Sequence, residues 1–109
     1  MVSHKFLETY AQLSSAYAAQ IEQCLSAMDS AFASLATMAV EEGLTAVRLH
    51  AHTLAGSAAT FGYAGVGLAA AELEDFLIPL IARGSAPSRS ENERLQTLVG
   101  RLRLAATHV

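Results

Sequence analysis

The sequence predicts an all-α fold, and three features of its composition carry that prediction. Alanine, the strongest helix former, is abundant along the chain, whereas proline occurs only twice. Aromatic residues, which favour strands, make up 6%, and β-branched residues are also scarce. With 52% hydrophobic and 16% charged residues, the chain can form a packed core. Its 109 residues correspond to one domain, residues 1–109, which we expect to be an antiparallel four-helix bundle with an additional N-terminal helix.

The first helical stretch runs from about Ser3 to Glu42 without a strong breaker. A helix of that length is unusual in a small globular domain, so we expect two helices with a boundary near residue 28. Ser26 and Asp29 are candidate N-caps for the second helix, because their side-chain oxygens can accept from free backbone N–H groups.

The next helix is expected from about Leu44 to Phe61. Apolar residues recur there at steps of three and four, as on the buried face of a helix: Val47, Ala51, Leu54, Ala58 and Phe61. Gly43 is a candidate break before this helix. Gly62 can end it, since glycine readily adopts the left-handed conformation found at helix C-termini.

Two more helices are expected, from about Val66 to Arg83 and from Ser90 to near the end of the chain. Turn-forming residues separate them over positions 84–90. Ser90 followed by Glu93 fits a capping box, in which the serine hydroxyl and the glutamate carboxylate each accept from a free backbone N–H.

Several function classes are disfavoured. A formal net charge of −3 gives no electrostatic reason to bind nucleic acid. No apolar run reaches the roughly 20 residues that span a bilayer, and the N-terminus lacks the apolar core of a signal peptide. We therefore expect no nucleic-acid or membrane partner and a cytoplasmic location, for which a single cysteine, Cys24, is typical.

Metal and cofactor sites are not expected either. His50 and His52 stand two positions apart, so on a helix their side chains point about 200° apart and cannot hold one ion. The metal-binding patterns CxxC and HExxH are also missing from the sequence.

The residues around His52 indicate a histidine that a partner protein can reach. The apolar stripe of its helix lies on the other side, so the imidazole should face solvent. Its neighbours on the exposed face are mostly small or apolar, where a surface helix normally carries Lys, Glu or Gln: Arg48, Leu49, Ala55, Gly56 and Ala59. Glycine lowers the stability of a helix, so Gly56 needs another reason to be there. Small side chains beside an imidazole allow a docking protein to reach the ring. An ordinary surface histidine is the alternative that spacing alone leaves open.

The segment from Ala51 to Gly62, AHTLAGSAATFG, resembles the signature of the histidine-containing phosphotransfer (HPt) family, roughly A-H-x-L-K-G-S-x-x-x-x-G. The likeness continues without a gap through Leu68 to the pair Leu73–Glu74, so its specific part covers residues 51–74. The N-terminal phosphotransfer domain of chemotaxis kinases is a related domain in which this segment also ends in Thr-Phe-Gly.

The resemblance implies a phosphorelay intermediate. His52 would accept a phosphoryl group from an aspartyl phosphate on one receiver domain and pass it to the aspartate of another, with the receiver and its Mg²⁺ supplying most of the electrostatic catalysis. The chain would be a phosphocarrier rather than an enzyme, and its partners would be response-regulator receiver domains and a hybrid histidine kinase. Glu74 matches the position that holds the other imidazole nitrogen. The docking patch implied around His52 contains Leu49, Ala55, Gly56 and Ala59.

One departure from the family pattern bears on function. The family usually has Lys three residues after the histidine, where this chain has Ala55. Arg48, one turn before His52, is a candidate phosphoryl contact in its place. The departure keeps open a second function, a degenerate adaptor bundle that docks a receiver or kinase without carrying phosphate.

A third function, a small metal- or haem-binding bundle, is disfavoured because the sequence lacks paired ligands. The initial Met favours a complete small protein.

Overall fold

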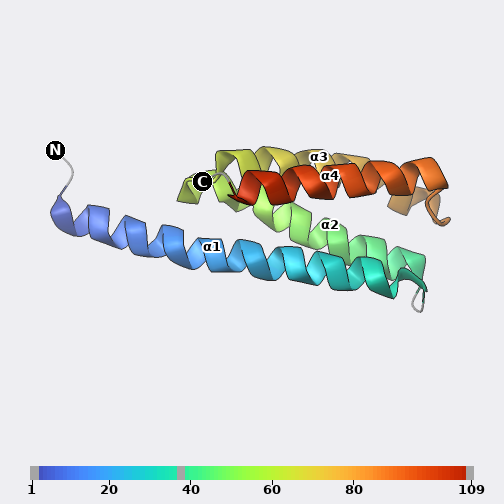
Figure 1. Cartoon of the computed structure of the whole chain (residues 1–109), viewed down its shortest axis with the longest axis horizontal. Coiled ribbons are helices and arrows are strands. Elements are labelled where there is room, and N and C mark those ends of the chain that lie inside the picture. The colour runs from blue at the N-terminus through green and yellow to red at the C-terminus, as the bar shows by residue number, and fades with distance from the viewer. Residues whose placement is uncertain (1–2, 37–38, 108–109) are drawn as a thin grey trace.

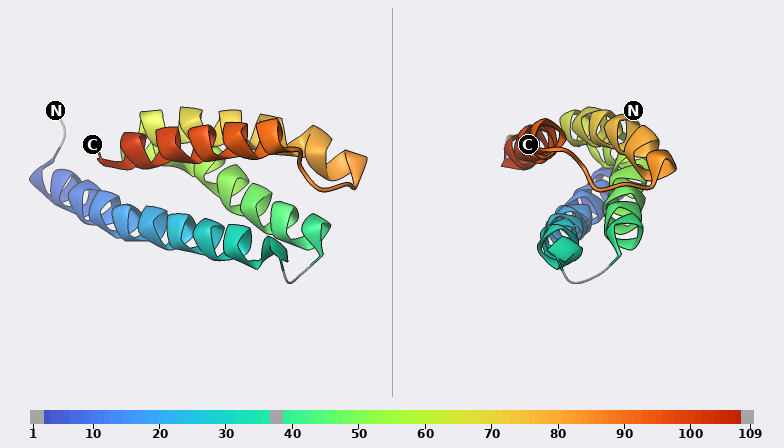
Figure 2. Two further views of the ribbon diagram at one scale, coloured as in Figure 1. Left: turned by 45° about the vertical axis from the view of Figure 1, so that its right-hand side comes forward. Right: turned by 90° about the vertical axis from the view of Figure 1, so that its right-hand side faces the viewer.

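The computed structural model describes residues 3–36 and 39–107, and over those residues it is helical without strands (Figure 1). Four α-helices and two short 3₁₀ turns follow one another: α1 (His4–Ala33), η1 (Ser34–Ala36), α2 (Val40–Ser57), η2 (Ala58–Phe61), α3 (Ala64–Arg83) and α4 (Arg89–Thr107). Successive α-helices run in opposite directions, and the end-on view in Figure 2 shows the four grouped around a common axis. The predicted all-α fold is confirmed.

A single cluster of buried side chains from all four α-helices forms the core. In this arrangement α2 packs against both α1 and α3, and α4 packs against α3. The helix expected to run to Phe61 ends at Ser57 and continues as η2. The predicted stripe is completely buried at Val47, Ala51 and Leu54 of α2 and at Ala58 of η2, and Phe61 is partly buried. Burying a Val- or Leu-sized side chain contributes roughly 1.5–3 kcal/mol, so this stripe fixes which face of α2 remains exposed.

The first helix, α1, is continuous where two helices were expected. The predicted boundary near residue 28 is wrong, and no separate additional helix occurs over the described N-terminal residues. Ser26 and Asp29 lie inside α1 and do not cap a second helix. Partly buried Phe32 packs against the core beyond the expected boundary. A fully buried stripe leads up to it: Tyr17, Ile21, Cys24, Leu25 and Met28. Packing against the bundle therefore supports a helix of 30 residues, a length that the sequence alone argues against.

The N-terminal turns of α1 reach past the ends of the other helices (Figure 1). The helix starts after Ser3, whose Oγ accepts from the Phe6 N–H at 3.1 Å. Its first ten residues include four exposed large apolar side chains: Phe6, Leu7, Tyr10 and Leu13. The N-cap thus places the helix start well before the first side chain that the core buries.

The start of α2 also differs from the prediction. It begins at Val40, before the expected Leu44, and Gly43 does not break it. Gly43 is buried in the first turn, where an added Cβ would collide with the Leu35 side chain. Its lack of a side chain therefore permits close approach between α2 and η1.

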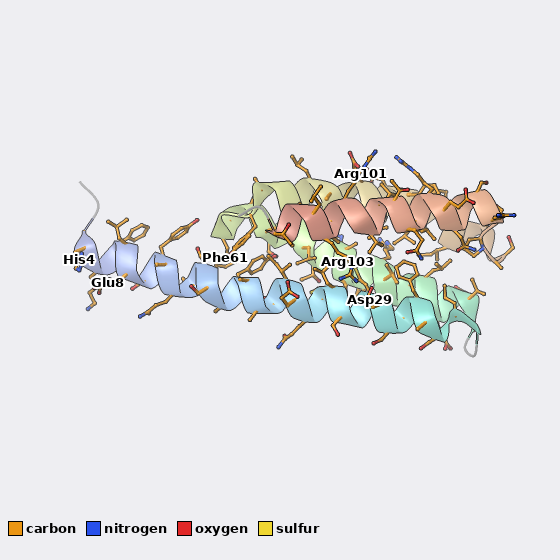
Figure 3. The ribbon with its side chains drawn as sticks, viewed as in Figure 1. His4, Glu8, Asp29, Phe61, Arg101 and Arg103 are labelled. Atoms are coloured by element: carbon orange, nitrogen blue, oxygen red, sulfur yellow. The ribbon has the colours of Figure 1, made fainter. Side chains whose placement is uncertain are left out.

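The turn that ends α2 is held in place by α1. Gly62 adopts the predicted left-handed conformation, with φ 93°. The Ser14 hydroxyl donates to the Phe61 carbonyl at 3.0 Å, and the Tyr63 hydroxyl donates to the Ser14 carbonyl, also at 3.0 Å. Tyr17 stacks on Phe61 with ring centroids 4.8 Å apart, and Figure 3 shows Phe61 directed toward α1. These contacts fix the end of α2 and the start of α3.

A capping box begins α4, but two residues earlier than predicted. Ser88, not Ser90, is the capping serine: its Oγ accepts from the Glu91 N–H at 3.2 Å, while Glu91 Oε1 accepts from the Ser88 N–H at 2.8 Å. The Glu91 carboxylate also accepts two hydrogen bonds from Arg83, at 2.8 and 2.9 Å. Arg83, at the end of α3, thus selects this register over the overlapping Ser90–Glu93 pattern.

The pKa of Glu91 predicts a loss of stability in acid. Hydrogen bonds from Arg83 and then from the Ser88 N–H lower the pKa of this carboxyl from 4.5 to about 2. A lowered folded-state pKa means that the stabilisation is complete above about pH 4.5 and is lost as the pH falls toward 2. We expect the difference in urea midpoint between wild type and Glu91→Gln to be constant above about pH 5 and to shrink below it. A difference that persists unchanged at about pH 3 would contradict this reasoning.

Candidate functional site

His52 stands on the exposed face of α2, as predicted. Its side chain is 68% exposed, whereas Ala51 and Leu54 beside it are completely buried. Because the buried stripe fixes the rotation of α2, the imidazole points away from the core. The ring is therefore open to a partner molecule.

Glu74 on α3 lies against the imidazole. Its Oε2 is 2.8 Å from His52 Nδ1, and its side chain is only 13% exposed. An ionised carboxylate can only accept hydrogen bonds, so Nδ1 carries the proton and donates to Oε2. The neutral ring then has an unprotonated Nε2, which is its nucleophilic nitrogen.

Arg48 completes a group of three charged or polar side chains. Its Nε lies 3.5 Å from the same Oε2 of Glu74, and its side chain is 43% exposed. The Nε atom itself is sealed from solvent and makes no hydrogen bond within the usual limits. The structure thus brings together Arg48, His52 and Glu74, and the contact from Arg48 to Glu74 is one that sequence reasoning missed. No local pattern links two residues that meet only when α2 and α3 pack.

The remaining predicted patch residues differ in exposure. Leu49 is 63% exposed, and Gly56 and Ala59 are also exposed. Ala55 is half-buried and packs against the core cluster on the side facing α3. On α3, Ile78 is 45% exposed and follows Glu74 by one turn, so it adds apolar surface that the sequence did not single out. The exposed imidazole is therefore bordered by small and apolar side chains.

Over residues 3–36 and 39–107, no group of three or more His, Cys, Asp or Glu side chains could hold a metal ion. The single cysteine, Cys24, is buried in the core, and its burial raises the pKa of its thiol.

Comparison with known families agrees with this site. The sequence model of the Hpt domain matches residues 6–105. The chain belongs to the Hpt domain family. Hpt domains carry phosphoryl groups on histidine in two-component phosphorelays and interact with receiver domains, so membership supports a histidine phosphotransfer role. No curated protein and no solved structure matches the chain. Within its described part, no helix has the length and apolar character needed to cross a membrane.

The substitution Gly56→Ala tests whether the fold requires glycine at this position. A Cβ added there would meet nothing within 4 Å, so Gly56→Ala should fit without strain and gain helix propensity. We expect it to raise the free energy of unfolding by about 0.5–1 kcal/mol in urea titrations. Gly62→Ala is the matched control and should lower it by about 1 kcal/mol, because φ is +93° at that position. A destabilised Gly56→Ala variant would mean that the fold itself requires this glycine.

Proposed function

We propose that this Hpt domain takes a phosphoryl group from the aspartyl phosphate of one receiver domain and delivers it to the aspartate of another, with His52 as the acceptor. The observation that carries the proposal is an imidazole that is 68% exposed while its Nδ1 lies 2.8 Å from Glu74 Oε2. Such a ring is accessible, and its Nε2 lone pair is free to react. The proposal treats residues 1–109 as one domain.

The transfer step follows from this geometry. The Nε2 lone pair attacks phosphorus, the bond from phosphorus to the aspartyl oxygen breaks, and the receiver's carboxylate leaves with the bonding electrons. The imidazole keeps its Nδ1 proton and becomes positively charged, and Glu74 stabilises that charge through the same hydrogen bond. The return step to a second receiver reverses these changes. Since the receiver supplies its own metal site and aspartate, the chain acts as a phosphocarrier rather than an enzyme.

The receiver would dock over the small and apolar side chains around His52. Leu49, Gly56 and Ala59 supply exposed or small side chains, and Ala55 borders them on the α3 side. A hybrid histidine kinase could present such a receiver, and a cytoplasmic location suits both partners. Removing side-chain bulk around the imidazole lets the receiver bring its phosphoryl group within reach of Nε2.

Arg48 is proposed as a phosphoryl contact in place of the lysine that Ala55 replaces. Its side chain is 43% exposed and lies on the same face of α2 as His52. A guanidinium can bind two phosphoryl oxygens at once, which a single ammonium group does less well.

A second candidate function rests on Ala55. Without the usual lysine, the domain would offer the phosphoryl group less positive charge, as expected of an adaptor that docks a receiver or kinase but carries no phosphate. The two functions differ in whether label ever reaches the chain.

Substitution of His52 separates them. We expect wild-type protein to take up label from at least one of a panel of radiolabelled phospho-receivers, as an acid-labile, alkali-stable adduct. His52→Gln should take up none, because His4, an exposed imidazole that also contacts a carboxylate, is bound to Glu8 through Nε2 at 2.9 Å, so the Nε2 that would react is occupied. His50→Gln is the matched control and should behave as wild type. Label on His52→Gln would contradict the assignment, and binding of a receiver without any label on wild type would favour the adaptor.

A further inference from the structure

We infer that Arg48 is a positioning residue: its guanidinium holds the Glu74 carboxylate by an ion pair, and Glu74 in turn holds His52 with Nε2 free. The inference rests on the proposed role of His52 as phosphoryl acceptor and gives Arg48 a task that begins before any phosphoryl group arrives.

A single oxygen atom connects the three side chains. Glu74 Oε2 lies 2.8 Å from His52 Nδ1 and 3.5 Å from Arg48 Nε. Arg48 Nε is shielded from water and makes no hydrogen bond, and the Glu74 carboxylate 3.5 Å away forms an ion pair with it. A buried donor without water is costly unless an acceptor is near, and a charged acceptor compensates best.

The carboxylate needs this second partner. The Glu74 side chain is only 13% exposed, so few water molecules can solvate its charge. A neutral imidazole supplies one N–H but no positive charge. The guanidinium supplies both. Without it, the Glu74 carboxylate would be better solvated if it turned toward water, and it would then leave Nδ1.

The packing around Arg48 suits a fixed rather than a mobile side chain. Arg48 lines a shallow hollow between α2 and α3 together with the apolar side chains of Ile78, Ile81 and Ala82. The methylene stem of arginine packs well on such surface while its charged end reaches a polar partner. Arg48 precedes His52 by one turn of α2, and both side chains reach the same oxygen of Glu74.

The tautomer of His52 tests the inference without any phosphotransfer. We would record two-dimensional ¹⁵N–¹H spectra of the imidazole nitrogens near pH 8, where wild type should show the Nδ1–H tautomer. Arg48→Ala should show a mixture that includes Nε2–H, and Arg48→Lys should restore part of the wild-type pattern. Arg101→Ala is the matched control, because Arg101 pairs with Glu72 at 3.3 Å on α3 but does not contact the site. An unchanged Nδ1–H pattern in folded Arg48→Ala would overturn the inference.

A double-mutant cycle on phosphotransfer rates separates positioning from direct phosphoryl contact. If Arg48 acts through Glu74, Arg48→Ala and Glu74→Ala should each slow acceptance by about tenfold, and the double variant should be no slower than the slower single one. If Arg48 acts on the phosphoryl group alone, the double variant should be slower by the product, about a hundredfold, and this result would overturn the inference. Should wild type accept no label, the proposed function fails, while the tautomer measurement still decides the role of Arg48.

Discussion

The candidate site depends on one hydrogen bond, from His52 Nδ1 to Glu74 Oε2, which joins α2 to α3 across 22 residues of sequence. It sets the tautomer of the imidazole and so determines which nitrogen can react. It also requires α2 and α3 to hold a fixed rotation and register, which the buried faces of both helices provide. The function proposed for the chain is therefore a consequence of helix packing as much as of the histidine itself.

The rest of the fold can be understood as support for that register. Gly67 of α3 lies against η2, where an added Cβ would be in ordinary van der Waals contact with the Ala58 Cβ at 3.6 Å. From the other side, α1 fixes the turn between α2 and α3: the Tyr17 and Ser57 hydroxyls lie 2.5 Å apart, and Ser14 bonds to the Phe61 carbonyl. On the far side of the bundle, Arg103 of α4 and Asp29 of α1 form an ion pair, visible in Figure 3. Surface pairs of this kind add little stability, so the core and the turn contacts hold the site.

Local patterns predicted what depends on local structure. The apolar spacing on α2 predicted the exposed face of His52, and Gly62 predicted the left-handed stop, which caps η2 rather than α2, because both follow from helix geometry and backbone sterics. Tertiary contacts decided the rest. Burial of Met28 keeps α1 continuous, and Arg83 selects Ser88 over Ser90 as the cap of α4. The pairing of Arg48 with Glu74 joins two helices and leaves no trace in either helix alone.

The measurement that tests the central claim most directly is the identity of the phosphorylated nitrogen on His52. Wild-type protein would be labelled by a phospho-receiver, digested under alkaline conditions, and its phosphohistidine isomers compared with standards by ³¹P NMR. Because Glu74 Oε2 occupies Nδ1, the account predicts phosphate on Nε2 alone. Phosphate on Nδ1 of His52 would contradict it, since that nitrogen could not react while it donates its proton to Glu74.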